Sequence, residues 1–187
     1  STNSLSEGQV LAEPYPYDKA RIIVAEMADS LVFQLTDKNL VTDGLTLDVG
    51  YDRENCDKGS YRGPVHIDHY GRSVPKGAHG SIHLGNPTNL GSSIITAAVE
   101  LFDRIANRSL TVRRITIAAN RVVQDEDVYQ FDLFTDVEKQ EKEKNLQKAM
   151  LGIKKKYGKN AVLKGTNFLD GATMRERNKQ VCGHKSE

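Results

Sequence analysis

The chain has 187 residues, of which 38% are hydrophobic and 27% charged, and its formal net charge is +1. This length supports one ordinary hydrophobic core with an appendage and argues against two full domains. No apolar run is long enough to cross a bilayer and no signal segment is present, so we expect a cytoplasmic protein without a membrane partner. Cys56 and Cys182 lie far apart and form no CxxC pair, which indicates free thiols rather than a disulfide or a zinc site.

The small net charge hides blocks of opposite sign. Residues 1–57 carry 4 basic and 11 acidic side chains, whereas residues 58–124 carry 9 basic and 3 acidic ones. Residues 125–135 carry 4 acidic side chains and no basic one, and residues 136–187 carry 13 basic and 7 acidic ones. Two basic segments therefore flank a short acidic linker, which makes nucleic acid the first partner to consider.

The first half of the predicted domain is a strand, a long helix and a second strand. Residues 4–11 are suited to a strand, and apolar residues recur at spacings of three and four over 17–40, which predicts an amphipathic helix. After a turn predicted at 42–44, residues 45–51 alternate between apolar and polar, which is the period of a half-buried strand. Residues 52–78 are rich in Gly, Pro, Asp and Arg, and we expect a long loop or an irregular excursion there.

The second half repeats this pattern. A short strand is predicted at 81–84, and the breakers at 85–87 separate it from a helix capped by Thr88 or Asn89. Alternation predicts a last strand from about 111 to 123. The order strand, helix, strand, strand, helix, strand indicates an α+β fold: a two-layer βαββαβ sandwich with a four-stranded antiparallel sheet and both helices on one face.

The uncovered face of this sheet carries the residues that we expect to contact a ligand. Continuing the alternation places hydroxyl, amide, imidazole and guanidinium groups on it, from Ser4, Ser6, Ser81, His83, Arg114, Thr116 and Asn120. No acidic residue lies between Asp103 and Asp125, and that stretch contains Arg104, Arg108, Arg113, Arg114 and Arg121. Such groups suit phosphate oxygens without reading a base sequence, so we predict that this face follows a nucleic-acid backbone.

Two other interpretations of this polar face are a solvated surface and an RNA-binding sheet. A polar strand face is often only the solvated side of an antiparallel sheet. An RNA-recognition sheet of the same topology presents stacking aromatic residues, and residues 80–84 contain none. The polar pattern across several strands favours binding of a phosphate backbone over both.

Several motifs resemble the little-finger domain of Y-family DNA polymerases: residues 3–11, residues 19–21 and residues 112–117. The resemblance covers most of residues 3–123, although the excursion at 52–78 is longer than the family pattern. It implies a domain that lies across the DNA duplex and holds both backbones through its sheet. The phosphate contacts that it implies are Ser4, Ser6, Arg113, Arg114 and Thr116, whereas Ser81, His83 and Asn120 are expected from the alternation alone.

The resemblance also implies what the parent protein does. The family's catalytic carboxylates hold two metal ions, Mg²⁺, in a palm domain upstream, and nothing in this sequence matches that domain. We therefore expect this segment to bind primer–template DNA and to contact the palm, fingers and thumb of the same polypeptide, without catalysis or a cofactor of its own. The parent protein would be a DNA-directed DNA polymerase for translesion synthesis.

A short motif follows the predicted domain. Gln130-Phe131-Asp132-Leu133-Phe134, directly after the acidic residues 125–127, is similar to the bacterial sliding-clamp-binding peptide. In that peptide the apolar pair would fill a pocket while the Gln hydrogen-bonds at its rim. An isolated match of this length usually indicates a core strand instead. Its position directly after a little-finger-like domain favours the clamp peptide.

The rest of the chain is predicted to be a basic helix and a tail. Residues 136–157 have a thin apolar stripe, so this helix either docks on a partner or stands solvated. Lysines between 148 and 164 would add salt-sensitive DNA affinity. Residues 177–185 resemble the C-terminal signature of UmuC-like polymerases from Gram-positive bacteria, with a flexible tail as the alternative. The predicted parts are a DNA-binding domain at 1–124, a linker with the clamp peptide at 125–135, and the helix and tail at 136–187.

Two functions of other classes fit parts of the sequence. His66, Asp68 and His69 carry side chains that bind metals, which suggests a small metal-dependent enzyme, but loop histidines are favoured because such clusters arise by chance. A protein-interaction module is the second alternative, with a protein on the sheet face and the 130–134 segment as part of the core.

Overall fold

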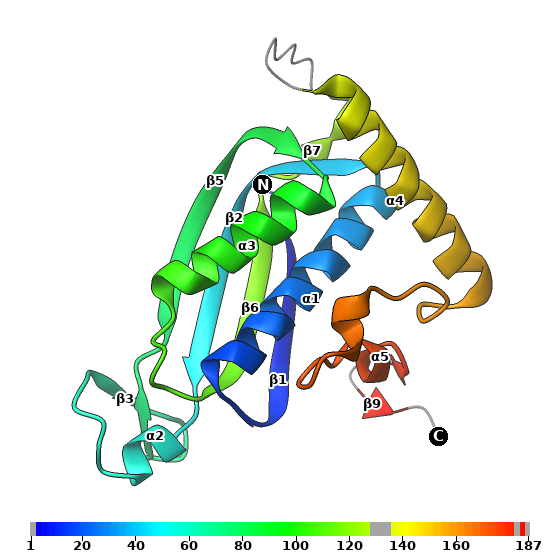
Figure 1. Cartoon of the computed structure of the whole chain (residues 1–187). Helices are drawn as coiled ribbons and strands as arrows, with labels where there is room; N and C mark the ends of the chain where they lie inside the picture. The colour runs from blue at the N-terminus through cyan, green and yellow to red at the C-terminus, as the bar shows by residue number, and fades with distance from the viewer. Residues whose placement is uncertain (1–2, 128–135, 182–183, 186–187) are drawn as a thin grey trace.

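The computed structural model describes residues 3–127, 136–181 and 184–185. Its long elements follow the predicted order: β1 (Leu5–Tyr15), α1 (Tyr17–Asp37), β2 (Leu40–Tyr51), β5 (Ala78–Thr88), α3 (Gly91–Ile105) and β6 (Val112–Asn120). The strands are arranged β1-β6-β2-β5 and pair antiparallel, while the short β7 (Val123–Gln124) pairs with the start of β2. Helices α1 and α3 lie side by side on one face of this sheet (Figure 1). The predicted two-layer βαββαβ sandwich is confirmed.

The core lies between the two helices and the sheet. The stripe of α1 includes Ile23 and Met27, and that of α3 includes Leu101, all fully buried. Beneath them, alternate residues of the central strands, such as Leu47 and Ile117, are equally buried. Burial of apolar surface contributes about 25 cal/mol per Å². The packing of both helices on the apolar face of the sheet is therefore favoured, and it leaves the opposite face open.

Two predicted strand boundaries are wrong. The turn expected at 42–44 is part of β2, where the Thr42 hydroxyl lies 2.5 Å from the carbonyl oxygen of Asn120. The register with β5 shifts there, since Thr42 lies opposite Thr88 and Gly44 opposite His83, and the extra residues belong to β5. The break expected at 85–87 lies inside β5, which continues to Thr88. Glycine and proline are tolerated there because β5 is an edge strand.

The predicted caps of the second helix, Thr88 and Asn89, do not cap it. Leu90 holds the N-cap position and its side chain makes no capping bond. The Thr88 hydroxyl accepts a bond from the Leu90 amide at 3.0 Å, and the Asn89 side chain donates to the carbonyl of Leu40 at 3.0 Å. The first amides of α3 are therefore left for acceptors from elsewhere in the chain.

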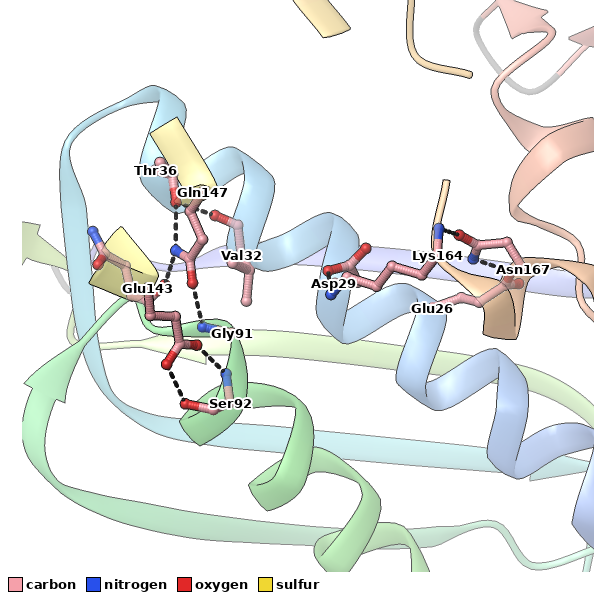
Figure 2. Close-up of polar contacts among 11 residues, drawn as sticks. Glu26, Asp29, Val32, Thr36, Gly91, Ser92, Glu143, Gln147, Lys164 and Asn167 are labelled. Atoms are coloured by element: carbon pink, nitrogen blue, oxygen red, sulfur yellow. Dashed lines mark hydrogen bonds and ion pairs between the residues drawn. The ribbon is translucent and has the colours of Figure 1, made fainter. Parts of the chain in front are cut away.

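Beyond residue 135 the chain folds back onto the helix layer (Figure 1). This C-terminal region contains α4 (Val137–Tyr157), η2 (Gly165–Phe168), α5 (Met174–Arg177), β8 (Gln180–Val181) and β9 (His184–Lys185). Side chains of α4 cap α3: Gln147 Oε1 accepts from the Gly91 amide at 2.7 Å, and Glu143 accepts from the Ser92 amide and hydroxyl at 2.8 Å each (Figure 2). The carboxylate of Glu143 is favoured at the positive N-terminal end of α3. Through these contacts α4 docks on its own domain.

A buried carboxylate anchors the residues that follow α4. Glu26 of α1 is 2% exposed and accepts bonds from Asn167 Nδ2 at 2.8 Å, from the Thr173 amide at 2.8 Å and from the Met174 amide at 3.0 Å. Figure 2 shows the Asn167 side chain directed at Glu26. A buried carboxylate is stable only when its oxygens are bonded, and here the C-terminal region supplies the donors.

Ion pairs surround this anchor at the surface. Lys164 Nζ lies 2.6 Å from Asp29 Oδ1, and Lys19 Nζ lies 3.0 Å from Asp170 Oδ2. Exposed pairs of this kind contribute little by themselves, so Glu26 is the main fixing point. The segment between α4 and α5 is therefore held against α1, while the flexible tail named as the alternative for residues 177–185 stays a prediction.

The predicted excursion at 52–78 holds the short α2 (Glu54–Asp57) and a hairpin of β3 (Val65–Ile67) and β4 (Ser73–Pro75), and it extends past the end of the sheet (Figure 1). Its base is fixed by Asn55, whose side chain exchanges two 3.0 Å hydrogen bonds with the backbone of Thr111.

Within the described residues, none of the helices combines the length and the apolar character that crossing a membrane requires.

Candidate nucleic-acid interface

The sheet face opposite the helices presents small and polar side chains in rows. Residues paired across neighbouring strands lie side by side on one face. One row consists of Ser6, Ala118, Thr46 and Ser81, the next of Gly8, Thr116, Asp48 and His79, and a third of Asn120, Gly44 and His83. Ser4 directly precedes β1 and is exposed. The structure thus brings the predicted residues of three strands together on one surface, which we call the open face.

Arg114 is an unpaired cation of the open face. It is exposed, and within the described residues it makes no recorded hydrogen bond or ion pair. It lies opposite Gly50, where a Cβ atom would be 3.3 Å from the Cβ of Arg114, so the glycine leaves room for the arginine side chain. A free guanidinium presents a fork of N–H donors that matches phosphate oxygens.

Arg113 has a different environment because β6 is bulged. Consecutive residues of β2 pair with Val112 and Arg114, so Arg113 is the extra residue between them. Its Nη1 donates to the carbonyl of Ala12 at 3.1 Å, and its Nε lies 3.7 Å from Asp52 Oδ2. The guanidinium is therefore held by the protein at one end of the sheet, and a phosphate there would share it with these partners.

Two of the other arginines of the acid-free stretch lie away from the open face. Arg104 donates to a backbone carbonyl of the edge strand β5 at 2.5 Å. Arg108 lies over the ring of Tyr17 in the helix layer, 5.0 Å from its centroid. Arg121 reaches the open face at its end: a Cβ at Gly44 would lie 2.8 Å from Arg121 Nη2, and Arg121 Nε lies 2.6 Å from Asp43 Oδ1. Arginines that are close in the sequence therefore lie in different places: Arg104 at the edge of the sheet, Arg108 in the helix layer and Arg121 at the end of the sheet.

Two carboxylates that the sequence did not predict as part of the site, Asp43 and Asp48, lie beside the predicted contacts. Asp48 Oδ1 lies 2.7 Å from His79 Nδ1, and Asp43 lies between Arg121, at 2.6 Å, and His83, at 3.6 Å. The Arg121 guanidinium beside Asp43 carries a fixed positive charge, which limits the repulsion of phosphate by that carboxylate. The alternation of β2 was the signal that locates Asp48 on the open face.

The metal-capable cluster lies in the hairpin, where Asp68 has a structural role. Its Oδ1 accepts from the amides of Tyr70 at 2.9 Å and Arg72 at 3.0 Å, and its Oδ2 is 2.8 Å from Arg72 Nε. The hydrogen bond from the Arg72 side chain lowers the pKa of Asp68 to about 2. His66 and His69 are exposed. In the described part of the chain, no three or more His, Cys, Asp or Glu side chains gather as metal ligands would.

The predicted clamp-binding residues Gln130, Phe131, Asp132, Leu133 and Phe134 fall outside the described residues. Their role therefore stays a prediction from sequence.

A split βαβ sandwich with an open polar face defines the class of domain. The chain belongs to the impB/mucB/samB family, whose C-terminal domain model matches residues 2–133. A curated DNA polymerase IV 2 from Halalkalibacterium halodurans is 28% identical over 111 residues, which are 59% of this chain and 26% of that protein. The putative UV-damage repair protein UvrX of Bacillus subtilis is 23% identical over 184 residues, which are 98% of this chain and 39% of that protein.

These matches confirm the predicted resemblance to the C-terminal domain of Y-family DNA polymerases. The UvrX match extends through the C-terminal region as well as the sandwich. A solved complex of the beta-clamp processivity factor and the little finger domain of PolIV aligns with a TM-score of 0.42 and 11% identity, over 71% of this chain and 100% of the other. So distant an alignment does not by itself establish a shared fold. The chain spans less than half the length of both curated relatives.

Proposed function

We propose that this domain holds DNA by its phosphate backbones and belongs to a polymerase that copies damaged templates. The observation that carries the proposal is the open face, with its rows of hydroxyl and amide groups beside an unpaired Arg114. The region that follows residue 135 packs on α1 and on the start of α3, and the sheet presents a broad polar surface to a ligand. Membership of the impB/mucB/samB family supports DNA as that ligand.

The chemistry of this contact is non-covalent. Hydroxyls such as those of Ser6, Ser81 and Thr116 donate hydrogen bonds to phosphate oxygens, and Arg114 supplies charge. Neither group reads a base edge, so binding is indifferent to sequence. Because each neutralised phosphate releases counterions, the affinity falls steeply as salt is raised.

Duplex binding tests this proposal. The 187-residue chain is titrated with fluorescently labelled duplexes of two unrelated sequences at about 50 and 200 mM salt. We expect equal affinities for the two sequences, and Arg114→Ala should lower the slope of log affinity against log salt by about 1. Arg108→Ala is the matched control, since Arg108 lies over Tyr17 in the helix layer.

Two results would contradict backbone binding. An absence of binding at low salt would remove the proposal, and the protein-interaction module would then explain the polar face. Strong preference for one of the two sequences would indicate base reading instead.

We infer that the parent polymerase is recruited to the sliding clamp by Gln130–Phe134, on sequence alone. Binding of the chain to purified bacterial clamp, with Leu133→Ala/Phe134→Ala as the variant, tests this. The expected result is loss of clamp binding with unchanged duplex binding. Early proteolytic cutting at 125–135 is also expected, whereas a core strand would resist cutting.

Nucleotide transfer by the parent protein would take place outside this segment. The Mg²⁺ ions of such polymerases are held by clustered carboxylates. The donor sets of the described residues contain no such cluster, so no catalytic step is assigned to this chain.

A further inference from the structure

The tip of the β3–β4 hairpin presents an aromatic ring to solvent in a fixed position. Tyr70 is 76% exposed. The Arg72 guanidinium lies over its ring, 4.7 Å from the centroid, and the His69 ring meets it edge-on at 5.4 Å. The three hydrogen bonds to Asp68 hold this turn together, and Gly71 takes the positive φ of +74° that the turn requires. The ring is thus pre-positioned although it covers no core.

The strands below the tip are also unusually exposed. All three residues of β3 are exposed, including Val65 at 48% and Ile67 at 62%. The one carboxylate between residues 61 and 77, Asp68, is occupied by Arg72, whereas Arg62 and Lys76 on the same hairpin are exposed. The hairpin thus combines exposed apolar surface with the positive charges of Arg62 and Lys76, and its acid is paired. This combination fits a nucleic acid, in which bases alternate with phosphates.

The hairpin begins and ends at the same end of the sheet as Arg114. Its flanking residues pair with the sheet, since Val49 lies opposite Ala78 and the next residue, Gly50, opposite Arg114. Figure 1 shows the hairpin extending from that end of β2 and β5. A strand of DNA that follows the open face toward Arg114 therefore leads to the hairpin.

We propose that this hairpin is a second DNA contact, at which Tyr70 stacks on an unpaired base of a strand that continues beyond the duplex held on the open face. The proposal rests on the proposed function of the open face. Arg72 covers one side of the ring, and the base takes the other. Stacking of this kind is tolerant of sequence because every base has a π-face.

A single tryptophan reports the contact directly. The chain contains no Trp, so Tyr70→Trp introduces one fluorophore that is quenched when a base stacks on it. The variant is titrated with a blunt duplex, with the same duplex carrying a single-stranded overhang, and with the single strand alone. We expect quenching by the overhang substrate and none by the blunt duplex.

Phe168 provides the matched control for that titration. It is 61% exposed in η2, outside the lysine-rich stretch, and the Arg175 guanidinium lies over its ring at 4.7 Å, as Arg72 does over Tyr70. Phe168→Trp should show no quenching with any of the three DNAs. Equal quenching of both reporters would overturn the proposal, because it would indicate non-specific collision.

Affinities separate this contact from the open face. Tyr70→Ala should lower affinity for the overhang substrate about tenfold and leave the blunt duplex unchanged, whereas Tyr70→Phe should retain full affinity. Arg114→Ala should weaken both substrates. Unchanged affinity of Tyr70→Ala for the overhang substrate would sink the hairpin proposal while leaving backbone binding intact. Quenching by single strands without any binding of the blunt duplex would support the hairpin and contradict the function proposed for the open face.

Discussion

Glu26 and Asn167 lie 141 positions apart in the chain, and the side-chain amide of Asn167 donates to the buried carboxylate of Glu26 at 2.8 Å. Glu26→Ala would leave this donor and the amides of Thr173 and Met174 buried without acceptors. We expect the free energy of unfolding to fall by at least about 2 kcal/mol, as measured by urea denaturation. Limited proteolysis should also cut the C-terminal region sooner.

The exposed Glu100 of α3 supplies the control for this change. Glu100→Ala removes the same side chain from a helix surface and should leave stability and proteolysis unchanged. If both variants behave alike, the C-terminal region is not anchored through Glu26.

The capping of α3 by α4 gives a second prediction. Glu143→Ala removes the acceptor for the amide and hydroxyl of Ser92, and we expect a loss of about 1 kcal/mol in unfolding free energy. Glu141→Ala is matched in helix propensity and in charge, but Glu141 points to solvent. Chemical denaturation followed by circular dichroism should separate the two. An equal effect would mean that the negative charge of α4, rather than the cap, is what matters.

Two glycine-to-alanine changes should act in opposite directions. A Cβ at Gly80 would lie 2.7 Å from Ile105 Cγ2 and 3.1 Å from Leu101 Cδ1, so these side chains must shift to make room for it. We expect Gly80→Ala to destabilise by about 1–3 kcal/mol. Gly152 has open space around it in the exposed middle of α4, and Gly152→Ala should stabilise by up to about 1 kcal/mol. Thermal melting of both variants checks the signs, and a stabilising Gly80→Ala would refute the close packing of α3 on β5.

Asp103 predicts a pH dependence of stability. The Arg21 guanidinium hydrogen-bonded to its carboxylate, together with the Tyr17 hydroxyl, holds the pKa of Asp103 below its usual value. A carboxyl with a lowered pKa in the folded state stabilises the fold above its unfolded pKa of about 3.9, and this contribution is lost as the pH falls through the folded pKa. The stability difference between wild type and Asp103→Asn should therefore be constant from about pH 7 to 5 and shrink below about pH 4. Urea denaturation at several pH values measures it, and a difference that grows in acid would contradict the assignment.

Periodicity was sufficient for the layered fold. The apolar stripes of α1 and α3 and the alternation of β2 and β6 each bury one face, so the order of elements predicted the two layers. The boundaries failed where local signals compete with tertiary contacts. The 42–44 segment looks like a turn, yet pairing with β6 and the Thr42 hydroxyl keep it in a continuous strand.

The candidate site was predicted only in part for a related reason. Alternation places Thr116 and Asn120 on the open face correctly, but the bulge at Arg113 is invisible to a count of alternating residues. The contacts of Glu26 and Glu143 join residues far apart in the chain, and helix patterns do not indicate which charged side chains will be partnered. The docking of the C-terminal region therefore had no signal in the sequence.

The position of β6 between β1 and β2 has a consequence for how the domain is made. Leu5 pairs with Ala119, which in turn pairs with Leu45, so β1 joins the sheet only through the last long strand. While the chain emerges from the ribosome, β2 and β5 are able to pair with each other, but the N-terminal strand has no backbone partner in the sheet until β6, which begins at Val112, has been synthesised. Contacts so distant in sequence slow folding. Completion of the sheet, and with it of the surface that carries Ser6 beside Thr116, is thus a single late event in the life of each new molecule.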